Sequence, residues 1–450
     1  MQSPKLSDHL WMPFTSWQDT IDYPPIIVKR GSGIYLYDQN DTPIIDGVGS
    51  WWVSLFGHNH PAISSAVKEQ LEQLEHVMMA GCVSEPTLRM IEQLSLLLPE
   101  GLTKIFLSDN GSTSVEVAMK IALQYHLQTG NERRRRFISF TGDYHGDTLG
   151  AQSVGNIPQY HHQFHQMFKK EFFTDPPNCF RCPCGKNKQS CSAECMDSFE
   201  KLLEEHHDEI AAFIFEPMVQ GAVGMRIYPP KVLQRCFELC KKWTILTIAD
   251  EVAMGFGRTG KMFACDHAGV VPDIMCLAKG LTAGYLPIAA TVVGDRLFEA
   301  FKGDAFSGKT FEHGHTYTGN PLASAACCAA LTLLKEINVP ESLMPLSRQQ
   351  EKLLASFAPY PIVGDIRTLG MVGAMELVID KNTKERLPAQ KRVTFTICRN
   401  ALKRGLLIRP LGDVIYLMLP YNTTEEQLSH IGEIMHEAFR ETINELLPDL

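Results

Sequence analysis

Short apolar runs alternate with helical patterns along most of the chain. Pro61 opens a segment in which Ile63, Val67 and Leu71 recur at the spacing of one helical face, which predicts an amphipathic helix. Five apolar runs have the length of buried strands and end in polar or glycine-containing sequence; they cover residues 105–107, 137–140, 211–215, 245–249 and 274–278. This alternation predicts an α/β fold with a mostly parallel central sheet.

The pattern changes after about residue 335, where helices are interspersed with short strand patterns such as residues 414–419. We therefore expect a large domain over residues 59–335. A smaller α+β domain is expected over residues 336–450, and the N-terminal segment 1–58 contributes to it.

Composition narrows the class of protein. The 450 residues are 44% apolar and 21% charged, as in a soluble globular chain with large cores. The net charge of −9 argues against general nucleic-acid binding, which needs a basic face. No apolar run approaches the roughly 18 residues of a membrane span, and the N-terminus lacks the pattern of an export signal. We expect a cytoplasmic protein that acts on small molecules.

Asp250 and Lys279 carry the first chemical signal. Each directly follows an apolar run. Because the carboxyl ends of parallel strands meet at one edge of a sheet, both side chains should lie in one crevice. A desolvated lysine near neutrality is a good Schiff-base nucleophile, and a buried aspartate keeps a pyridinium nitrogen protonated, as pyridoxal phosphate requires. A plain buried ion pair is the alternative interpretation.

Two further segments fit a phosphorylated aromatic cofactor. Gly111 and Ser112 lie between a strand and a helical pattern, where they would offer backbone N–H groups to a phosphate. Ordinary helix capping uses the same residue types. Tyr144 follows another strand and would present an aromatic face at the crevice, although such residues are often packed in a core.

Nine short strings in the sequence resemble those of a known family. DNGS at 109–112, GDYHGDT at 142–148, ADEVAMGFGRTG at 249–260, LAKGLTAGYLP at 277–287 and GHTYTGNP at 314–321 resemble the class III pyridoxal phosphate-dependent aminotransferases of fold type I. Within that class, HLWMPFTSW at 9–17, DGVGSWW at 46–52, HVMMAG at 76–81 and IRPLGDVIYLMLPY at 408–421 resemble the branch that converts 8-amino-7-oxononanoate to 7,8-diaminononanoate in biotin biosynthesis. The similarity extends over nearly the whole chain.

The resemblance implies a role for each matching cofactor residue. Lys279 would form the Schiff base with pyridoxal phosphate and transfer the proton. Asp250 would pair with the ring nitrogen, and Tyr144 would stack on the ring. Gly111 and Ser112 would hold the phosphate.

The resemblance also implies a homodimer with shared sites. His315 and Thr316 would reach the phosphate in the neighbouring subunit. The residues that would line the substrate pocket are Trp51, Tyr144, Lys279 and Gly314. Arg409 would bind the carboxylate of 8-amino-7-oxononanoate. The implied amino donor is S-adenosylmethionine; L-lysine is the alternative donor, and another class III ω-aminotransferase is the alternative activity.

Two features support weaker, competing interpretations. Gly255, Gly257 and Gly260 match a dinucleotide fingerprint, as in a nicotinamide oxidoreductase, but they neither follow a strand directly nor precede a helical face. The loop 175–195 contains five of the 13 cysteines: Cys179, Cys182, Cys184, Cys191 and Cys195. Its C-x2-C pair could belong to a zinc module of a nucleic-acid-binding protein, but the second pair is C-x3-C and no matching histidine follows. We predict no bound metal.

Overall fold

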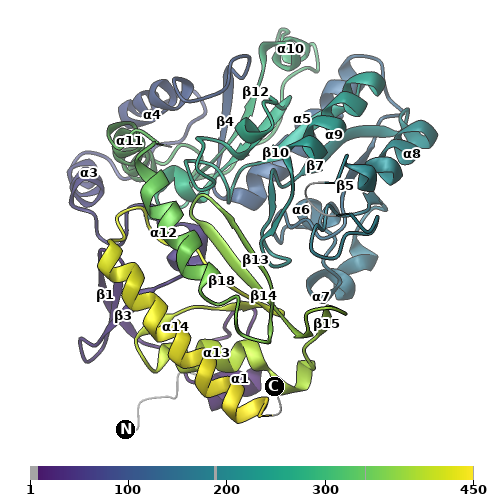
Figure 1. Cartoon of the computed structure of the whole chain (residues 1–450). Coiled ribbons are helices and arrows are strands. Elements are labelled where there is room, and N and C mark those ends of the chain that lie inside the picture. The colour runs from purple at the N-terminus through teal and green to yellow at the C-terminus, as the bar shows by residue number, and fades with distance from the viewer. Residues whose placement is uncertain (1–8, 187–189, 340, 449–450) are drawn as a thin grey trace.

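A seven-stranded sheet lies at the centre of the larger part of the molecule (Figure 1). The computed structural model describes residues 9–186, 190–339 and 341–448. In sheet order the strands are β4 (Lys104–Ser108), β12 (Ala289–Val293), β11 (Ile274–Leu277), β10 (Leu246–Asp250), β7 (Ile210–Phe215), β5 (Arg136–Phe140) and β6 (Phe172–Thr174). β12 runs antiparallel to both neighbours, and all the others share one direction. The predicted mostly parallel sheet is confirmed.

The five predicted strands are β4, β5, β7, β10 and β11, whereas β6 and β12 were not predicted. β4 shares the direction of the parallel strands, but its hydrogen-bonded neighbour is the antiparallel β12. Only residues 278–288 connect β11 to β12. A parallel crossover needs a dozen or more residues, so this connection returns the chain in the opposite direction.

Helices cover both faces of the large sheet. The longer helices of the chain are α3 (Pro61–Leu71), α4 (Glu85–Ser95), α5 (Gly111–Gln128), α8 (Asp197–His206), α9 (Pro230–Trp243), α11 (Pro321–Glu336), α12 (Met344–Ala355), α13 (Val393–Leu402) and α14 (Glu425–Leu446). The last three pack with one another and with the C-terminal strands instead of the large sheet. On one face, Ile214, Ile248 and Ile274 pack in one buried cluster with α5. Phe213 and Phe215 belong to a second cluster, which extends to the C-terminal part. The sheet is therefore buried on both sides, as its near-continuous apolar strands require.

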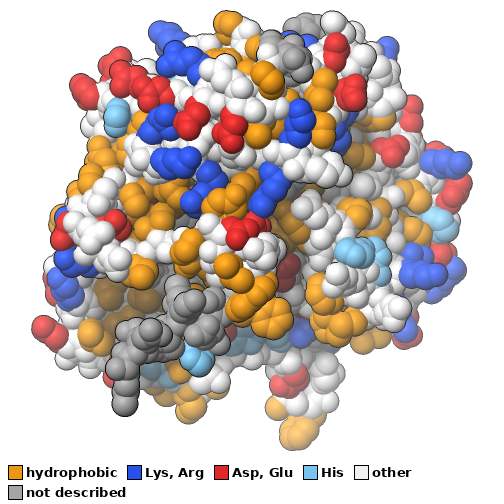
Figure 2. Space-filling model, turned by 90° about the horizontal axis from the view of Figure 1, so that it is seen from below, with side chains coloured by type: hydrophobic (Ala, Val, Ile, Leu, Met, Phe, Trp, Pro, Cys, Tyr) orange, Lys and Arg blue, Asp and Glu red, His pale blue; other side chains and the backbone are white. Residues whose placement is uncertain are grey.

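The amphipathic helix begins at Pro61 as predicted. Ile63 is fully buried, whereas Leu71 is 60% exposed, so its apolar stripe is only partly covered within one chain. Among the described residues, no single helix is long and apolar enough to cross a membrane; α11 passes that test only together with the helices after it, as a pair bent by 73°. Charged side chains of both signs lie among hydrophobic ones on the face in Figure 2.

Both ends of the chain contribute to a second region, at the lower left of Figure 1. One sheet joins β1 (Val28–Ser32), β2 (Tyr35–Asp38) and β3 (Pro43–Asp46) to β16 (Leu406–Leu407), which runs parallel to β3. A second, antiparallel sheet contains β13 (Val363–Leu369), β14 (Val372–Asp380), β15 (Glu385–Arg386), β17 (Pro410–Leu411) and β18 (Val414–Leu417). The domain limits at residues 58 and 335 stay predictions.

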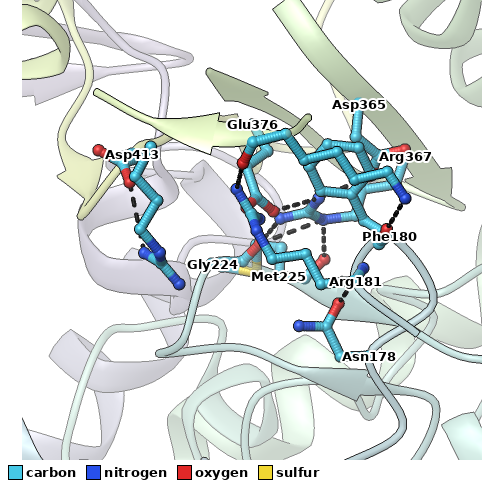
Figure 3. Close-up of polar contacts among 11 residues, drawn as sticks. Asn178, Phe180, Arg181, Gly224, Met225, Asp365, Arg367, Glu376 and Asp413 are labelled. Atoms are coloured by element: carbon cyan, nitrogen blue, oxygen red, sulfur yellow. Dashed lines mark hydrogen bonds and ion pairs between the residues drawn. The ribbon is translucent and has the colours of Figure 1, made fainter. Parts of the chain in front are cut away.

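A buried arginine joins the two regions. Arg367 on β13 is 5% exposed and donates to the carbonyls of Gly224 and Met225, next to the short hairpin of β8 (Val219–Gln220) and β9 (Arg226–Ile227). It also pairs with Glu376 at 3.0 Å. Arg181, from the cysteine-rich loop, pairs with the other oxygen of Glu376, and Figure 3 shows the two guanidinium groups meeting at this carboxylate.

Candidate active site

Asp250 and Lys279 lie at the carboxyl ends of adjacent strands, as predicted. β10 ends at Asp250, and Lys279 follows β11 after one residue, at the start of the short 3-10 helix η5 (Lys279–Thr282). The lysine has φ +44°, a conformation that is rare for a side-chain-bearing residue and often marks a functional position.

The amine of Lys279 lies against an aromatic ring and has no polar partner among the described residues. Its Nζ lies 4.5 Å from the ring centroid of Trp52 and makes no hydrogen bond or ion pair with any residue that the structure describes. The alternative of a direct ion pair with Asp250 is therefore not observed. Burial lowers the pKa of Lys279, against the opposing charges of Asp250 and Glu216. A neutral, accessible amine is what a nucleophilic lysine needs.

Asp250 is 6% exposed and held at both oxygens. Its Oδ1 accepts the backbone N–H of Val252 at 3.1 Å, and its Oδ2 lies 2.7 Å from Nδ1 of the buried His145. Burial alone would lower the pKa of His145, but the contact with Asp250 and the charge of Asp143 raise it. Both carboxylate oxygens of Asp250 therefore have a polar partner.

A glycine-lined cradle lies beside these groups, at the start of α5. Asn110 caps the helix by accepting the N–H of Thr113 at 3.1 Å, so Gly111 and Ser112 fall in the first turn, whose N–H groups favour an anion. A Cβ on Gly146, which has φ +114°, would lie 2.6 Å from Cβ of Ser112. Any side chain there would displace Ser112, so the glycine lets this loop pack closely against the first turn of α5, whose N–H donors fit a phosphate.

Aromatic side chains line the mouth of the site. Tyr160 lies 5.5 Å from the ring of Phe14 and 6.5 Å from that of Tyr144. Trp51 meets Phe14 edge-on at 5.6 Å, and its ring lies 5.1 Å from the guanidinium carbon of Arg409. Arg409 is exposed, so this guanidinium is available to an anionic ligand.

The backbone beneath Trp51 is strained. Ser50, Trp51 and Trp52 have φ values of 46°, 67° and 75° inside the short helix α2 (Gly49–Trp52). Each such residue costs of order 1–3 kcal/mol and persists only where its surroundings enforce it. The hydrogen bond from the Trp52 indole to the Tyr416 hydroxyl, at 3.1 Å, helps to hold this segment.

The segment with Gly314, His315 and Thr316 lies at the surface of one chain. Gly314 and Thr316 are exposed, and His315 makes a 2.8 Å ion-pair contact with Asp109, next to the α5 cap. His315 thus links this segment to the residues that cap α5. Its place at the site of a neighbouring subunit stays a prediction.

Three residues of the site were not assigned a role from the sequence. Asp147 accepts the hydroxyl of Tyr144 at 2.7 Å. Glu216 directly follows β7 and accepts the backbone N–H of Tyr144 at 2.9 Å, so the reasoning used for Asp250 would have found it. His145 stood inside a quoted string, but its partner is 105 residues away, which no local pattern reveals.

Two features of the string at 249–260 have structural roles. Arg258 is of a residue type that recognises carboxylates, but it is fully buried and donates to the carbonyls of Ser54 and Leu419, so its donors are used within the fold. Gly257 and Gly260 lie in turns, followed only by the short η4 (Ala264–His267). The objection to a dinucleotide fingerprint is thereby confirmed, since no α-helix starts there.

The cysteine-rich loop gathers its thiols around one cavity. Four of the five line this small cavity: Cys179, Cys182, Cys191 and Cys195. Among the described residues, no group of three or more His, Cys, Asp or Glu side chains is placed to hold a metal ion. Burial and the neighbouring cysteines raise the pKa of Cys195 to about 12, so this thiol stays neutral. The absence of a bound metal stays a prediction.

Comparison with known proteins identifies the family. The family model described as aminotransferase class III matches residues 18–439, and the chain belongs to this family. It is a pyridoxal phosphate-dependent aminotransferase of fold type I, as the quoted strings predicted.

The most informative relatives carry one name. An adenosylmethionine-8-amino-7-oxononanoate aminotransferase from Nitratidesulfovibrio vulgaris is 41% identical over 96% of this chain and 80% of its own length. One from Geobacter sulfurreducens is 41% identical over 96% of this chain and 95% of its own.

Solved structures show the same fold. The crystal structure of adenosylmethionine-8-amino-7-oxononanoate aminotransferase from Methanocaldococcus jannaschii matches with a TM-score of 0.91 and 36% identity, over 97% of this chain and 98% of that chain. An amine transaminase from an uncultivated Pseudomonas species, in its PLP-bound internal aldimine form, matches with a TM-score of 0.92 and 32% identity, over 96% and 99% of the two chains.

Proposed function

We propose that this chain transfers an amino group to 8-amino-7-oxononanoate, giving 7,8-diaminononanoate in cytoplasmic biotin biosynthesis, with S-adenosylmethionine as the donor. The observation that carries the proposal is the amine of Lys279, which has no polar partner among the described residues and follows the strand next to that of the buried Asp250, with the exposed Arg409 at the mouth of the same site. The names of the relatives and the quoted N- and C-terminal strings support this substrate.

Each residue of the cofactor site has a proposed role. Bound pyridoxal phosphate supplies an electron sink for the transfer of an amino group. Lys279 would hold the cofactor and move a proton with its freed amine, which its lowered pKa favours. Asp250 would pair with the ring nitrogen, and Tyr144 would cover one face of the ring. The N–H groups of Gly111 and Ser112 would hold the phosphate.

The mouth of the site fits an aliphatic substrate with a terminal carboxylate. Arg409 would bind that carboxylate, because a guanidinium offers two parallel N–H donors. Trp51 and Phe14 would shield the alkyl chain from water. Tyr144, whose hydroxyl is fixed by Asp147, would line the pocket near the reacting carbon. Lys279 and Gly314 would complete the lining.

A homodimer would complete the phosphate cradle. In the proposed dimer, Thr316 and His315 of one protomer approach the cradle of its partner. Apolar side chains near this segment are exposed in one chain: Phe306 is 99% and Tyr317 is 64% exposed. A second copy of the chain would cover such groups, which soluble proteins rarely leave in large patches.

The donor assay tests the proposal. Purified enzyme loaded with pyridoxal phosphate receives 8-amino-7-oxononanoate and either S-adenosylmethionine or L-lysine, and 7,8-diaminononanoate is measured by mass spectrometry. We expect product with S-adenosylmethionine and none with Lys279→Ala. Product with L-lysine alone would show that lysine is the donor in place of S-adenosylmethionine. No product with either donor would refute 8-amino-7-oxononanoate as the substrate.

A further inference from the structure

We propose that Trp52 is a positioning residue for the amine of Lys279: the face of its indole ring holds this amine at the site and leaves its lone pair free to react. The inference rests on the proposed function, in which Lys279 holds the cofactor and moves a proton. It concerns the place of the amine whenever it is not bonded to the cofactor.

One amine and one ring make the contact. Nζ of Lys279 lies 4.5 Å from the centroid of the Trp52 ring, within the roughly 6 Å over which an aromatic face attracts an ammonium group. Among the described residues this amine has no hydrogen bond or ion pair. The face of the ring attracts the protonated amine but carries no donor hydrogen, so it does not engage the lone pair of the neutral amine.

Tyr416 binds the one polar hydrogen of the indole. The N–H of Trp52 donates to the hydroxyl of Tyr416 at 3.1 Å, and the two rings meet edge-on with 6.2 Å between their centroids. Trp52 is 5% exposed and Tyr416 is 1% exposed. Because an indole has a single donor and this one is already bonded, Trp52 offers the amine only its aromatic surface.

A glycine packs against the same ring. A Cβ on Gly221 would lie 3.2 Å from Cζ3 of Trp52 and 3.3 Å from its Cη2. The ring would then have to move by a few tenths of an ångström. Gly221 therefore allows the indole to be displaced slightly without being removed.

Both partners of the contact have a left-handed backbone. Lys279 has φ +44° and Trp52 has φ +75°. Neither a lysine nor a tryptophan favours this conformation, which persists only where the surrounding structure enforces it and which is frequent at functional sites. The fold thus holds both residues in unfavoured conformations at the point where their side chains meet.

Charged groups near Lys279 do not substitute for the ring. The charges that act on its amine are those of Asp250, Glu216 and Arg258. Each of these groups is hydrogen-bonded elsewhere, and burial raises the pKa of Glu216 to about 8, so this carboxyl group is mostly protonated near neutrality. Burial lowers the pKa of Lys279. Since an aromatic face favours the ammonium form, loss of the ring should lower this pKa further.

Trp52→Leu removes the ring and keeps an apolar side chain. Trp243→Leu is the matched control, because the amine of Lys242 lies 5.1 Å from the ring of Trp243. Trp243 ends α9 ahead of β10, whereas the site lies at the opposite end of β10. The side chain of Lys242 is 53% exposed and pairs with Glu200 at 3.5 Å, so this lysine also serves as an internal reference.

Two milder substitutions keep Trp52 in place. Tyr416→Phe removes the hydroxyl that accepts the indole N–H, which frees the ring to turn. Gly221→Ala forces the ring to move. Both leave the aromatic core in place, so they decide if Trp52→Leu fails to fold.

The first readout is the protonation of Lys279 in the full chain without cofactor. Lysines are acetylated with acetic anhydride across a pH series, and peptide mass spectrometry gives the pH midpoint of labelling for Lys279 and Lys242. We expect the Lys279 midpoint to fall by about 0.5 pH unit or more in Trp52→Leu, by less in the milder variants, and not at all in Trp243→Leu. A merely structural role of Trp52 would lower the urea midpoint of unfolding without moving the labelling midpoint.

The second readout is the rate at which the protein binds pyridoxal phosphate, followed by stopped-flow visible absorbance above the labelling midpoint, where the amine is neutral. We expect binding to slow about fivefold or more in Trp52→Leu, because the amine is no longer held in a reactive position. Unchanged labelling and binding in Trp52→Leu, or in both milder variants if it does not fold, would overturn the inference and leave the proposed function intact. Failure of the wild-type protein to form 7,8-diaminononanoate would refute the proposed function, and these two readouts would still decide on Trp52.

Discussion

Replacing Arg409 tests how the site recognises a carboxylate. Arg409 is exposed and lies over Trp51, with 5.1 Å between the guanidinium carbon and the ring centroid. Methionine keeps an unbranched apolar stem against this ring but removes the donors. A hydrogen bond to a charged group contributes about 1.5–3 kcal/mol, and solvent at an exposed position favours the lower end of that range.

About 1.5–2 kcal/mol corresponds to a loss of roughly 10- to 30-fold in kcat/KM for 8-amino-7-oxononanoate in Arg409→Met. The assay compares the acid with its methyl ester at saturating donor. Wild type should favour the acid by this factor, and the variant should treat both alike. Arg404→Met, which removes a partly buried arginine paired with Glu437 and Glu441, should behave as wild type. An equal loss for acid and ester would refute the reasoning, because Arg409 would then act through folding.

Three more outcomes follow from buried contacts. Gly146 has φ +114°, and a Cβ there would lie 2.6 Å from Cβ of Ser112. Gly146→Ala should therefore weaken pyridoxal phosphate binding at least tenfold, measured by titration of the apoenzyme. Unchanged affinity would show that this close approach does not shape the phosphate site. Arg367→Met removes a hydrogen-bond donor from Asp365, Glu376 and two backbone carbonyls. It should lower the free energy of unfolding in urea by about 3–5 kcal/mol. A loss under about 1 kcal/mol would contradict a stabilising role of this buried network. Burial alone would raise the pKa of Asp46, but hydrogen bonds with His58 and Ser50 lower it below 3.8. Its stabilising contribution is therefore present above that pH and is lost as the pH falls through its folded pKa, so Asp46→Asn should flatten the acid limb of a stability profile.

The strands that hold the site were predictable because their signal is local. Each run of apolar residues at β7, β10 and β11 is buried on both faces, and a polar residue directly after such a run must lie at the sheet edge. That logic was sufficient for Asp250 and Lys279. β6 has only three residues and carried no comparable signal. β12 is an apolar run that the sequence analysis did not assign, and its antiparallel direction depends on a short connection.

Other parts of the site depend on contacts between distant segments. Arg258 looks like a ligand-binding residue in the sequence, yet its guanidinium is used by the carbonyls of Ser54 and Leu419, 204 and 161 residues away. The left-handed backbone at Trp51 is imposed by its surroundings, since nothing in a tryptophan favours it. Such features follow from the packed structure and have no pattern along the chain.

Trapping the cofactor on its lysine tests the central claim most directly. Wild-type protein loaded with pyridoxal phosphate is reduced with borohydride, digested and examined by mass spectrometry for the phosphopyridoxyl group. The account predicts loss of the visible absorbance on reduction and the modification on the peptide that contains Lys279, with neither change in Lys279→Ala. A protein that stays colourless with the cofactor, or a modification confined to other lysines, would contradict it.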